Sequence, residues 1–261
     1  MKLRVLGCSG SFSGPESPAS SYLLEMPWSQ SADGRTFRMV LDLGSGALGA
    51  LQRYADLYSI DAVGLSHLHA DHCIDLCSYY VARKYHPDGP QPRIPVYGPY
   101  ATAERMAAAY GLPLEPGMRE EFEFLPWAVG HPLRLGPFRI TAAVVNHPVA
   151  AYALRFEWQE GASRRSLVYS GDTGPSRALE ELAKDADLFL CEATFLSARQ
   201  NPPDVHLTGL QAGGYASRAG VRRLVLTHIP PWTDRQKVLD EAASVYDGPL
   251  ELAAPGAAYE I

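Results

Sequence analysis

Hydrophobic residues follow two patterns along the chain, and each pattern predicts one kind of element. Dense short runs of Val, Leu, Ile, Phe and Tyr, bounded by Gly, Pro or Asp, are typical of β-strands. They predict strands at Lys2–Gly7, Ser21–Met26, Thr36–Leu43, Ala62–Ser66, Ile94–Tyr97, Phe138–Val145, Tyr152–Trp158, Ser166–Ser170, Leu188–Cys191 and Arg223–Thr227. Apolar positions at helical spacing predict helices at Ala47–Leu57, Cys73–Tyr85, Ala101–Tyr110, Ser176–Lys184, Leu210–Ala219 and Asp234–Tyr246.

The order of these elements predicts an α/β fold. Hairpin-linked strands come first, with a turn signal at Asp33-Gly34 within Ser31–Arg35, and mixed strands and helices follow. Two mixed sheets flanked by helices on the outside fit this order. Because Pro87–Pro99 is typical of a loop and no low-complexity linker interrupts the chain, we expect one domain over residues 1–261.

Composition and charge narrow the class of protein. With 46% hydrophobic and 20% charged residues, the chain is typical of a globular protein. No apolar run approaches the ~20 residues of a membrane span, and the N-terminus lacks the apolar stretch of a signal peptide. We therefore expect a cytoplasmic protein with reduced cysteines, in which Cys73 and Cys77 are core thiols rather than a second metal site. The net charge of −6 disfavours a stable nucleic-acid partner.

The stretch SHLHADHCIDL, which begins at Ser66, contains three of the eight histidines of the chain. His67 and His69 are two apart at the end of a predicted strand, so their side chains point to the same side. Asp71 and His72 follow where the next helix begins, and all four side chains can converge on one cavity. Imidazole and carboxylate suit zinc, whereas a site richer in oxygen suits manganese or iron.

Further candidate ligands stand where other predicted strands end. They are His147 in VVNHPV, Asp172 in VYSGDTG and His228 in LVLTHIPP. A single zinc ion needs only three or four ligands, so seven candidates predict two divalent ions. His86 and His131 each precede a proline in a loop, and we assign them no role.

The motif His67-x-His69-x-Asp71-His72, followed by His147, Asp172 and His228, resembles that of the metallo-β-lactamase fold hydrolases. The match covers almost the whole chain in family order. The resemblance implies a four-layer αββα sandwich with two metal ions at one edge. It assigns the ligands as follows: His67, His69 and His147 to one ion, Asp71, His72 and His228 to the other, and Asp172 to both.

Such a centre suits phosphoryl chemistry. Two divalent ions about 3.5–4 Å apart can share a hydroxide and clamp both oxygens of a phosphoryl displacement. Asp42, in VLDLGSG, matches the aspartate that ends an early strand in this fold, and we expect it to orient the histidine-rich loop from behind the ligands. We expect zinc, with Mn²⁺ or Fe²⁺ as the alternatives.

The segments LFLCEATF and DVHLTGLQAG resemble the glutamate and histidine boxes of the ribonuclease Z-like phosphodiesterase branch. The resemblance implies that Glu192 and His206 deliver a proton next to the metals. A phosphodiester has a poor alkoxide leaving group, which a histidine held in the right tautomer by a carboxylate can protonate. The alternative is that Glu192 caps a helix and His206 is an ordinary loop residue. We expect His206, Glu192 and Asp71 to be the catalytic residues.

The spacing between two ligands bears on substrate size. Ribonuclease Z usually carries a long flexible arm between the third ligand histidine and the bridging aspartate, but His147 and Asp172 are only 25 residues apart (172 − 147). The whole chain is similar to the bacterial cyclic-AMP phosphodiesterases of the atypical class II. This resemblance implies hydrolysis of a small phosphodiester, a 3′,5′-cyclic nucleotide such as cyclic AMP, to the nucleoside monophosphate. No membrane partner is expected, and a homodimer is left open.

Other functions stay open at this point. One is an RNA-processing nuclease of the ribonuclease Z type, and another is a 2′,3′-cyclic phosphodiesterase, because no spacing distinguishes the two cyclic esters. A thioester or lactone hydrolase uses the same fold, although Glu192 with His206 argues against it. The last is a metal-binding sensor without turnover. Fold alone does not decide between them.

Overall fold

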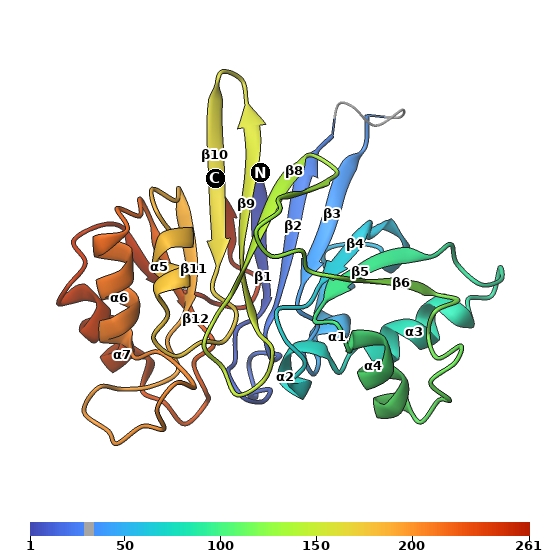
Figure 1. Ribbon diagram of the computed structural model, residues 1–261, viewed down its shortest axis with the longest axis horizontal. Coiled ribbons are helices and arrows are strands. Elements are labelled where there is room, and N and C mark those ends of the chain that lie inside the picture. Colours follow the sequence, from blue (N-terminus) through green and yellow to red (C-terminus); the bar gives the residue numbers. More distant parts are fainter. Residues whose placement is uncertain (29–33) are drawn as a thin grey trace.

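In the computed structural model, which describes residues 1–28 and 34–261, two sheets of seven strands each lie face to face (Figure 1). The first sheet has the order β14 (Ala258–Glu260), β1 (Lys2–Gly7), β2 (Ser21–Pro27), β3 (Thr36–Leu41), β4 (Ala62–Gly64), β5 (Ile94–Gly98) and β6 (Phe122–Pro126). The second has the order β13 (Leu250–Leu252), β12 (Leu224–Thr227), β11 (Leu188–Glu192), β10 (Ser163–Tyr169), β9 (Tyr152–Glu160), β8 (Phe138–Val144) and β7 (Leu133–Leu135).

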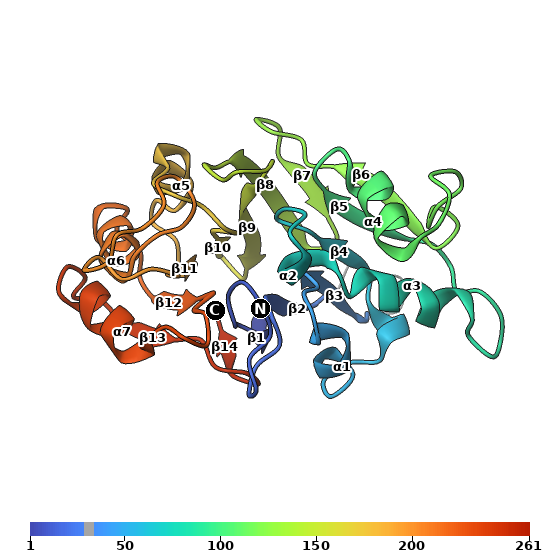
Figure 2. The same cartoon turned by 90° about the horizontal axis from the view of Figure 1, so that it is seen from below.

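Helices cover the outer face of each sheet, which completes four layers (Figure 2). The first sheet carries α1 (Ala47–Leu51), a 3-10 turn η1 (Leu57–Ser59), α2 (Ala70–Cys73), α3 (Leu76–Lys84) and α4 (Thr102–Tyr110). The second carries α5 (Arg177–Leu182), α6 (Gly209–Arg218) and α7 (Arg235–Ala243). Both sheets contain parallel and antiparallel pairs, so the predicted fold class is confirmed. Within residues 1–28 and 34–261, no helix has the length and apolarity needed to cross a bilayer.

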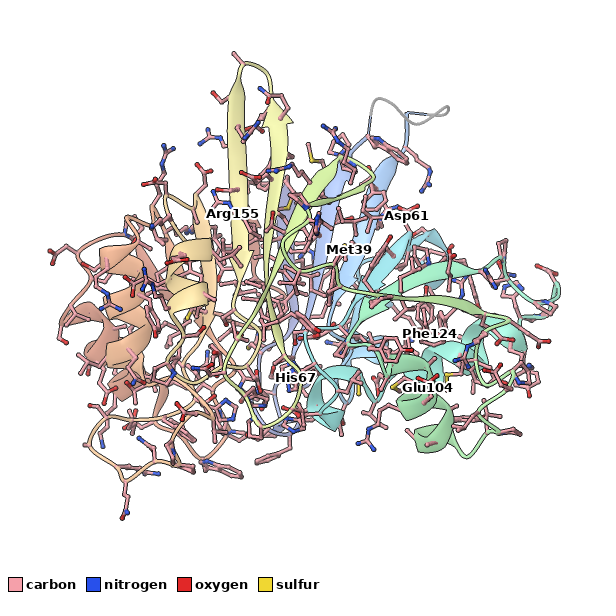
Figure 3. All side chains as sticks on the ribbon, in the orientation of Figure 1. Met39, Asp61, His67, Glu104, Phe124 and Arg155 are labelled. Atoms are coloured by element: carbon pink, nitrogen blue, oxygen red, sulfur yellow. The ribbon has the colours of Figure 1, made fainter. Side chains whose placement is uncertain are left out.

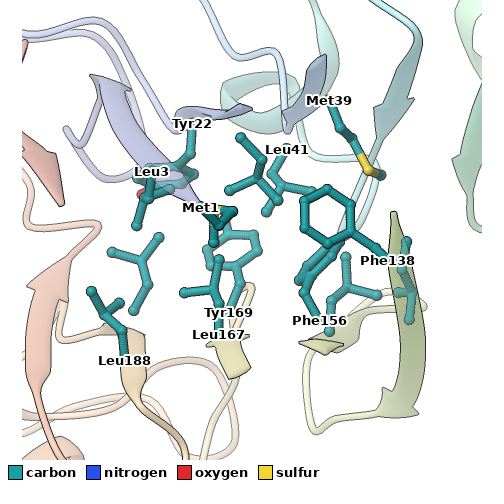
Figure 4. Close-up of a cluster of buried hydrophobic side chains, with 14 of the residues drawn as sticks. Met1, Leu3, Tyr22, Met39, Leu41, Phe138, Phe156, Leu167, Tyr169 and Leu188 are labelled. Atoms are coloured by element: carbon teal, nitrogen blue, oxygen red, sulfur yellow. The ribbon is translucent and has the colours of Figure 1, made fainter. Parts of the chain in front are cut away.

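The central strands are apolar in continuous runs because both of their faces are buried. In β3, Met39 and Leu41 point into the core between the sheets, whereas Val40 points to the helices outside. In β10, Leu167 and Tyr169 face that same inter-sheet core from the other side (Figure 4). This alternation, with a period of two residues, explains why unbroken apolar runs were a reliable strand signal here.

Four strands were not predicted, and they are the four outermost strands of the two sheets: β6, β7, β13 and β14. An outermost strand pairs on one side only and keeps much of its surface exposed, so its sequence carries a weak apolar pattern. Every residue of β13 is only partly buried, and in β14 only Tyr259 is buried.

Two predicted helices were too long. The helix expected at Ala47–Leu57 ends at Leu51, and η1 forms separately after it. The helix expected at Cys73–Tyr85 is divided into α2 and α3 at Asp75, whose N–H donates to the carbonyl of Leu43 at 3.0 Å instead of to the preceding turn. The Asp75 carboxylate in turn accepts a hydrogen bond from the N–H of Leu48 at the start of α1, at 2.9 Å. The strands β2 and β3 pair as expected, but residues 29–33, with Asp33 of the predicted turn, lie outside the described residues.

The two ends of the sandwich differ. At one end the hairpin of β9 and β10 projects beyond the sheets (Figure 1). At the other end the chain leaves β3, β4, β8, β10 and β12 in loops, and His67 lies at that end (Figure 3). The carboxyl ends of strands from both sheets therefore meet at one edge, where their side chains can share a site.

Candidate metal centre

The seven predicted ligands converge at this edge in two groups. The first group has three nitrogens: Nδ1 of His69 lies 3.1 Å from Nε2 of His67 and 3.1 Å from Nε2 of His147. Zinc–nitrogen bonds of ~2.0–2.1 Å in a tetrahedron would separate such nitrogens by ~3.3–3.4 Å. The observed spacing is therefore close to that of three ligands on one ion.

The second group has four members, all within 4.8 Å of one another by their ligand atoms: Asp71, His72, Asp172 and His228. Nε2 of His228 lies 3.2 Å from a carboxylate oxygen of Asp71 and 3.2 Å from one of Asp172. Nε2 of His72 lies 3.2 Å from the other oxygen of Asp172.

Asp172 also reaches the first group. Its Oδ2 lies 3.7 Å from Nε2 of His67, so this carboxylate stands between the two sets of ligands. The arrangement matches the one that the resemblance implied, with Asp172 between His67, His69 and His147 on one side and the second group on the other.

Two features of the cluster fit bound cations. Nε2 of His72 and Oδ1 of Asp172 are buried, and neither has a hydrogen-bond partner among the described residues. Buried polar atoms normally have one, and a cation bound between this nitrogen and this oxygen would satisfy both. In addition, the carboxylates of Asp42, Asp71, Asp172 and Glu192 are largely buried, and no Lys or Arg in the described part of the chain pairs with them. Buried charge needs compensation, which divalent ions would supply.

Hydrogen bonds at the other ring nitrogen orient three of the histidine rings. Nδ1 of His72 donates to Oδ2 of Asp42 at 2.7 Å. Nδ1 of His147 donates to the carbonyl of Val205 at 2.9 Å. Nδ1 of His67 donates to the hydroxyl of Ser66 at 3.1 Å, and that hydroxyl donates to Asp42 at 2.7 Å. In each ring, this bond fixes the tautomer that leaves Nε2 free for a metal.

His228 is oriented by a similar relay from the opposite side. Its Nδ1 donates to the hydroxyl of Thr194 at 2.8 Å, and this hydroxyl donates to Oε2 of Glu192 at 2.9 Å. His228 itself has a φ of 56°, which is rare for a residue with a side chain. A residue with a side chain keeps this left-handed backbone conformation only where its surroundings hold it there, and such residues are often found at functional sites.

Asp42 occupies the position behind the ligands that we predicted. It is fully buried and has a φ of 54°. Besides His72, it accepts hydrogen bonds from the N–H of Ser66 at 2.6 Å, from the Ser66 hydroxyl, and from the Tyr169 hydroxyl at 2.6 Å. Four donors on one carboxylate anchor the start of the histidine-rich loop to β3 and β10.

The protonation of the first group suits metal binding. Burial lowers the pKa of His67 well below its usual range, and burial also lowers the pKa values of His69 and His147. These rings are therefore neutral near pH 7, the form in which imidazole binds metals. Burial opposes the ionisation of Asp172, but His228 and His72 outweigh it and hold the pKa of that carboxyl well below its usual range.

Glu192 and His206 lie beside both groups as a hydrogen-bonded pair. Nδ1 of His206 lies 2.9 Å from Oε1 of Glu192, and 3.9 Å from Oδ2 of Asp172. Glu192 is buried in β11 and also accepts the N–H groups of Thr173 at 2.8 Å and Leu207 at 3.2 Å. Burial would lower the pKa of His206, but the Glu192 carboxylate outweighs it and raises that pKa to about 9.

Sequence reasoning missed the residues that connect these groups, namely Ser66, Tyr169 and Thr194. Each lies within two residues along the chain of a predicted catalytic or ligand residue, or three in the case of Tyr169. Thr194 follows Glu192 by two residues, but hydroxyl residues are too common in loops for this spacing to be a signal. His86 and His131 are not in the cluster, and Cys73 and Cys77 pack with the helix-side core.

Comparison with known proteins agrees with this geometry. The family described as the β-lactamase superfamily domain matches this chain over residues 38–229. The uncharacterized protein Rv1339 of Mycobacterium tuberculosis is 45% identical over 100% of this chain and 92% of its own length. The probable metallo-hydrolase YhfI of Bacillus subtilis is 30% identical over the full length of both chains. Its crystal structure has a TM-score of 0.84, with 29% identity and 99% of each chain covered.

A third relative, the ribonuclease Z of Myxococcus xanthus, is 30% identical over 85% of this chain and 88% of its own. The family match includes every predicted metal ligand, from His67 to His228. The chain therefore belongs to the β-lactamase superfamily, as a metallo-hydrolase with the metallo-β-lactamase fold.

Proposed function

We propose that the protein is a phosphodiesterase that binds two divalent metal ions and hydrolyses a small phosphodiester. Zinc is the ion that we propose for both positions. We propose a 3′,5′-cyclic nucleotide, cyclic AMP above all, as the substrate and the nucleoside monophosphate as the product. One observation carries the proposal: the Glu192–His206 pair lies directly beside the metal-ligand cluster. Such a pair supplies the proton that an alkoxide leaving group requires.

The residues would hold the ions as two groups of three, with Asp172 between them. Bound there, the ions would supply Lewis acidity and an activated water. Asp71 and Asp172 offset the positive charge at the centre, and Asp42 keeps the ring of His72 in place. His69, His147 and His206 are partly exposed, so a phosphodiester can reach the site from solvent.

His206 would act on the leaving oxygen. Because Glu192 binds Nδ1, the proton on Nε2 is the one available for transfer. With a pKa raised to about 9, His206 is in its acid form at neutral pH. As the bond between phosphorus and the ribose oxygen breaks, the proton goes to the ribose oxygen, and the oxygen of the attacking water stays on phosphorus. When His206 takes up a proton again, the Glu192 carboxylate stabilises the positively charged ring.

The preference for a small diester rests on shape and charge. The gap between His147 and Asp172 contains only the hairpin of β9 and β10, which projects from the end of the sandwich opposite the site (Figure 1). The gap therefore contains no long arm of the kind that would hold a large RNA. The net charge of −6 also disfavours binding to the backbone of a structured RNA.

A second candidate function is RNA processing of the ribonuclease Z type. The observation that favours it is the 30% identity to the Myxococcus xanthus ribonuclease Z. The same Glu192–His206 pair would serve an RNA leaving group equally well, so the two candidates differ in what binds and share the chemistry.

A substrate panel separates these candidates. We expect the metal-loaded protein to hydrolyse 3′,5′-cyclic AMP and GMP with a higher kcat/KM than 2′,3′-cyclic nucleotides, a thioester or precursor transfer RNA. The measurement is steady-state turnover of each compound by one preparation at fixed salt. Cleavage of precursor transfer RNA with a far higher kcat/KM than any cyclic nucleotide would instead favour the nuclease.

A further inference from the structure

Two exposed aromatic side chains lie in contact beside the metal centre. The ring centroids of Phe12 and Trp232 are 4.6 Å apart, although 40% of Phe12 and 64% of Trp232 are exposed. Single exposed aromatics are common on protein surfaces, but two that are packed on each other and left open to solvent form a small apolar patch. Neither side chain takes part in the proposed chemistry.

The pair lies next to His228, one of the candidate metal ligands. The N–H of Ser11, which precedes Phe12, lies 3.4 Å from Nε2 of His228. Trp232 follows His228 by four residues, in the loop HIPPWT. Two loops that are far apart in sequence thus bring one aromatic ring each to the rim of the same site.

Both loops are constrained. The Ser9 hydroxyl donates to the carbonyl of Phe12 at 2.7 Å, and the Phe12 N–H donates to the carbonyl of Gly10 at 2.7 Å. A side chain at Gly10 would clash, because its Cβ would lie 2.3 Å from the carbonyl oxygen of His228. The N–H of Thr233 closes a turn onto Pro230 at 2.9 Å. The backbone that carries the two rings is therefore preorganised, which reduces the entropy lost when a ligand binds.

A cavity of about 200 Å³ is lined by Trp232 and by residues of the loop that follows Glu192. Thr194, whose hydroxyl binds His228, and Phe195, whose ring is 5.1 Å from that of His206, form part of its wall. Asn201 also lines it and donates its side-chain N–H to the carbonyl of Leu196 at 2.9 Å, which leaves the amide oxygen for a ligand. The cavity thus combines an aromatic wall with a polar group, and two of its lining residues contact His228 and His206.

We propose that Trp232, supported by Phe12, is the platform on which the base of a nucleotide substrate stacks while its phosphate lies at the metal centre. This inference rests on the proposed function and deepens it, since it makes a nucleobase part of what the site recognises. An aromatic platform binds any base by its face. A base edge then faces the cavity that Asn201 lines.

The test compares ligands with and without a base. Equilibrium binding of AMP and of ribose 5-phosphate to the metal-loaded protein is measured by calorimetry. Stacking on one aromatic side chain contributes roughly 5- to 150-fold to affinity. Trp232→Ala should therefore weaken AMP binding by roughly that factor and leave ribose 5-phosphate unchanged. Trp232→Tyr should retain most of the affinity, and Phe12→Ala should show a smaller loss in the same direction.

Tyr85→Ala is the matched control, because Tyr85 is 66% exposed but lies at the end of α3, away from the site. It should leave both ligands unaffected. Equal losses for AMP and ribose 5-phosphate in Trp232→Ala, or wild-type binding of AMP no tighter than of ribose 5-phosphate, would overturn the platform.

Turnover of cyclic AMP is measured in the same preparations and tests the proposed function separately. If the wild type binds AMP through Trp232 but hydrolyses no cyclic nucleotide, the platform stands and the proposed substrate is wrong. If cyclic AMP is hydrolysed and Trp232→Ala changes neither its kcat/KM nor the affinity for AMP, the proposed substrate stands and the platform is wrong.

Discussion

Replacing Asp172 by alanine is expected to disturb both metal sites at once and to remove nearly all turnover. Its two carboxylate oxygens lie 3.2 Å from Nε2 of His72 and 3.2 Å from Nε2 of His228, and one is 3.7 Å from His67. Among the carboxylates in the described part of the chain, only Asp172 contacts imidazoles of both groups. The loss of activity should exceed the ~10²–10³-fold that removal of one charge-stabilising group costs.

Elemental analysis of unchelated, metal-replete protein is the measurement. The wild type should contain two ions per chain, and Asp172→Ala clearly fewer, with both groups affected. Asp88→Ala provides the control, because the Asp88 side chain is 91% exposed and should leave metal content and turnover unchanged. A wild type that is fully active with a single ion, or an Asp172→Ala variant that still holds two, would contradict the bridging role.

Removing the imidazole of His206 should slow hydrolysis of a cyclic nucleotide by ~10²–10⁴-fold, the typical contribution of general acid catalysis. The same variant should lose far less on a p-nitrophenyl diester, because p-nitrophenolate leaves without a proton whereas a ribose oxygen does not. The comparison of kcat between the two substrates therefore isolates proton delivery. Unchanged metal content in His206→Ala and unchanged turnover in His131→Ala, which alters an exposed histidine, are the controls.

Glu192→Gln should show the same pattern with a smaller loss, and the double variant should resemble His206→Ala alone, since residues that act as a unit are not additive. The carboxylate raises the pKa of His206 to about 9, so the acid form prevails below that pH. Loss of its charge lowers this pKa, and the alkaline decline of kcat should move to lower pH. Equal losses on both diesters would indicate that the pair positions substrate or metal instead.

The sequence predicted the interior of the fold better than its borders. Strands such as β3 and β10 are buried on both faces, so packing demands an unbroken apolar run that can be read directly. The edge strands β7 and β13 are held mainly by backbone hydrogen bonds to one neighbour, and backbone bonds leave little trace in side-chain type. The break between α2 and α3 likewise coincides with a backbone hydrogen bond from Asp75 to the distant carbonyl of Leu43, which no local pattern contains.

The cluster of candidate ligands was predictable because metal binding demands rare residue types at strand ends. Their supports were not, because hydroxyl groups such as those of Ser66 and Thr194 become significant only when the fold places them between a carboxylate and an imidazole. Asp42 was the exception, since the resemblance to a family supplied its role. The Phe12–Trp232 contact joins positions 220 residues apart (232 − 12), which only the folded chain brings together.

The candidate ligands come from both sheets, and this has a thermodynamic consequence. His67, His69, Asp71 and His72 follow β4 in the first sheet, whereas His147, Asp172 and His228 follow strands of the second. Ions bound among them would act as cross-links at the open end of the sandwich. By linkage, each ion would add about 2.7 kcal/mol to the free energy of unfolding when free metal is 100-fold above its Kd. Metal supply would then govern how long the folded chain persists, and a melting temperature indifferent to chelator would refute such cross-linking.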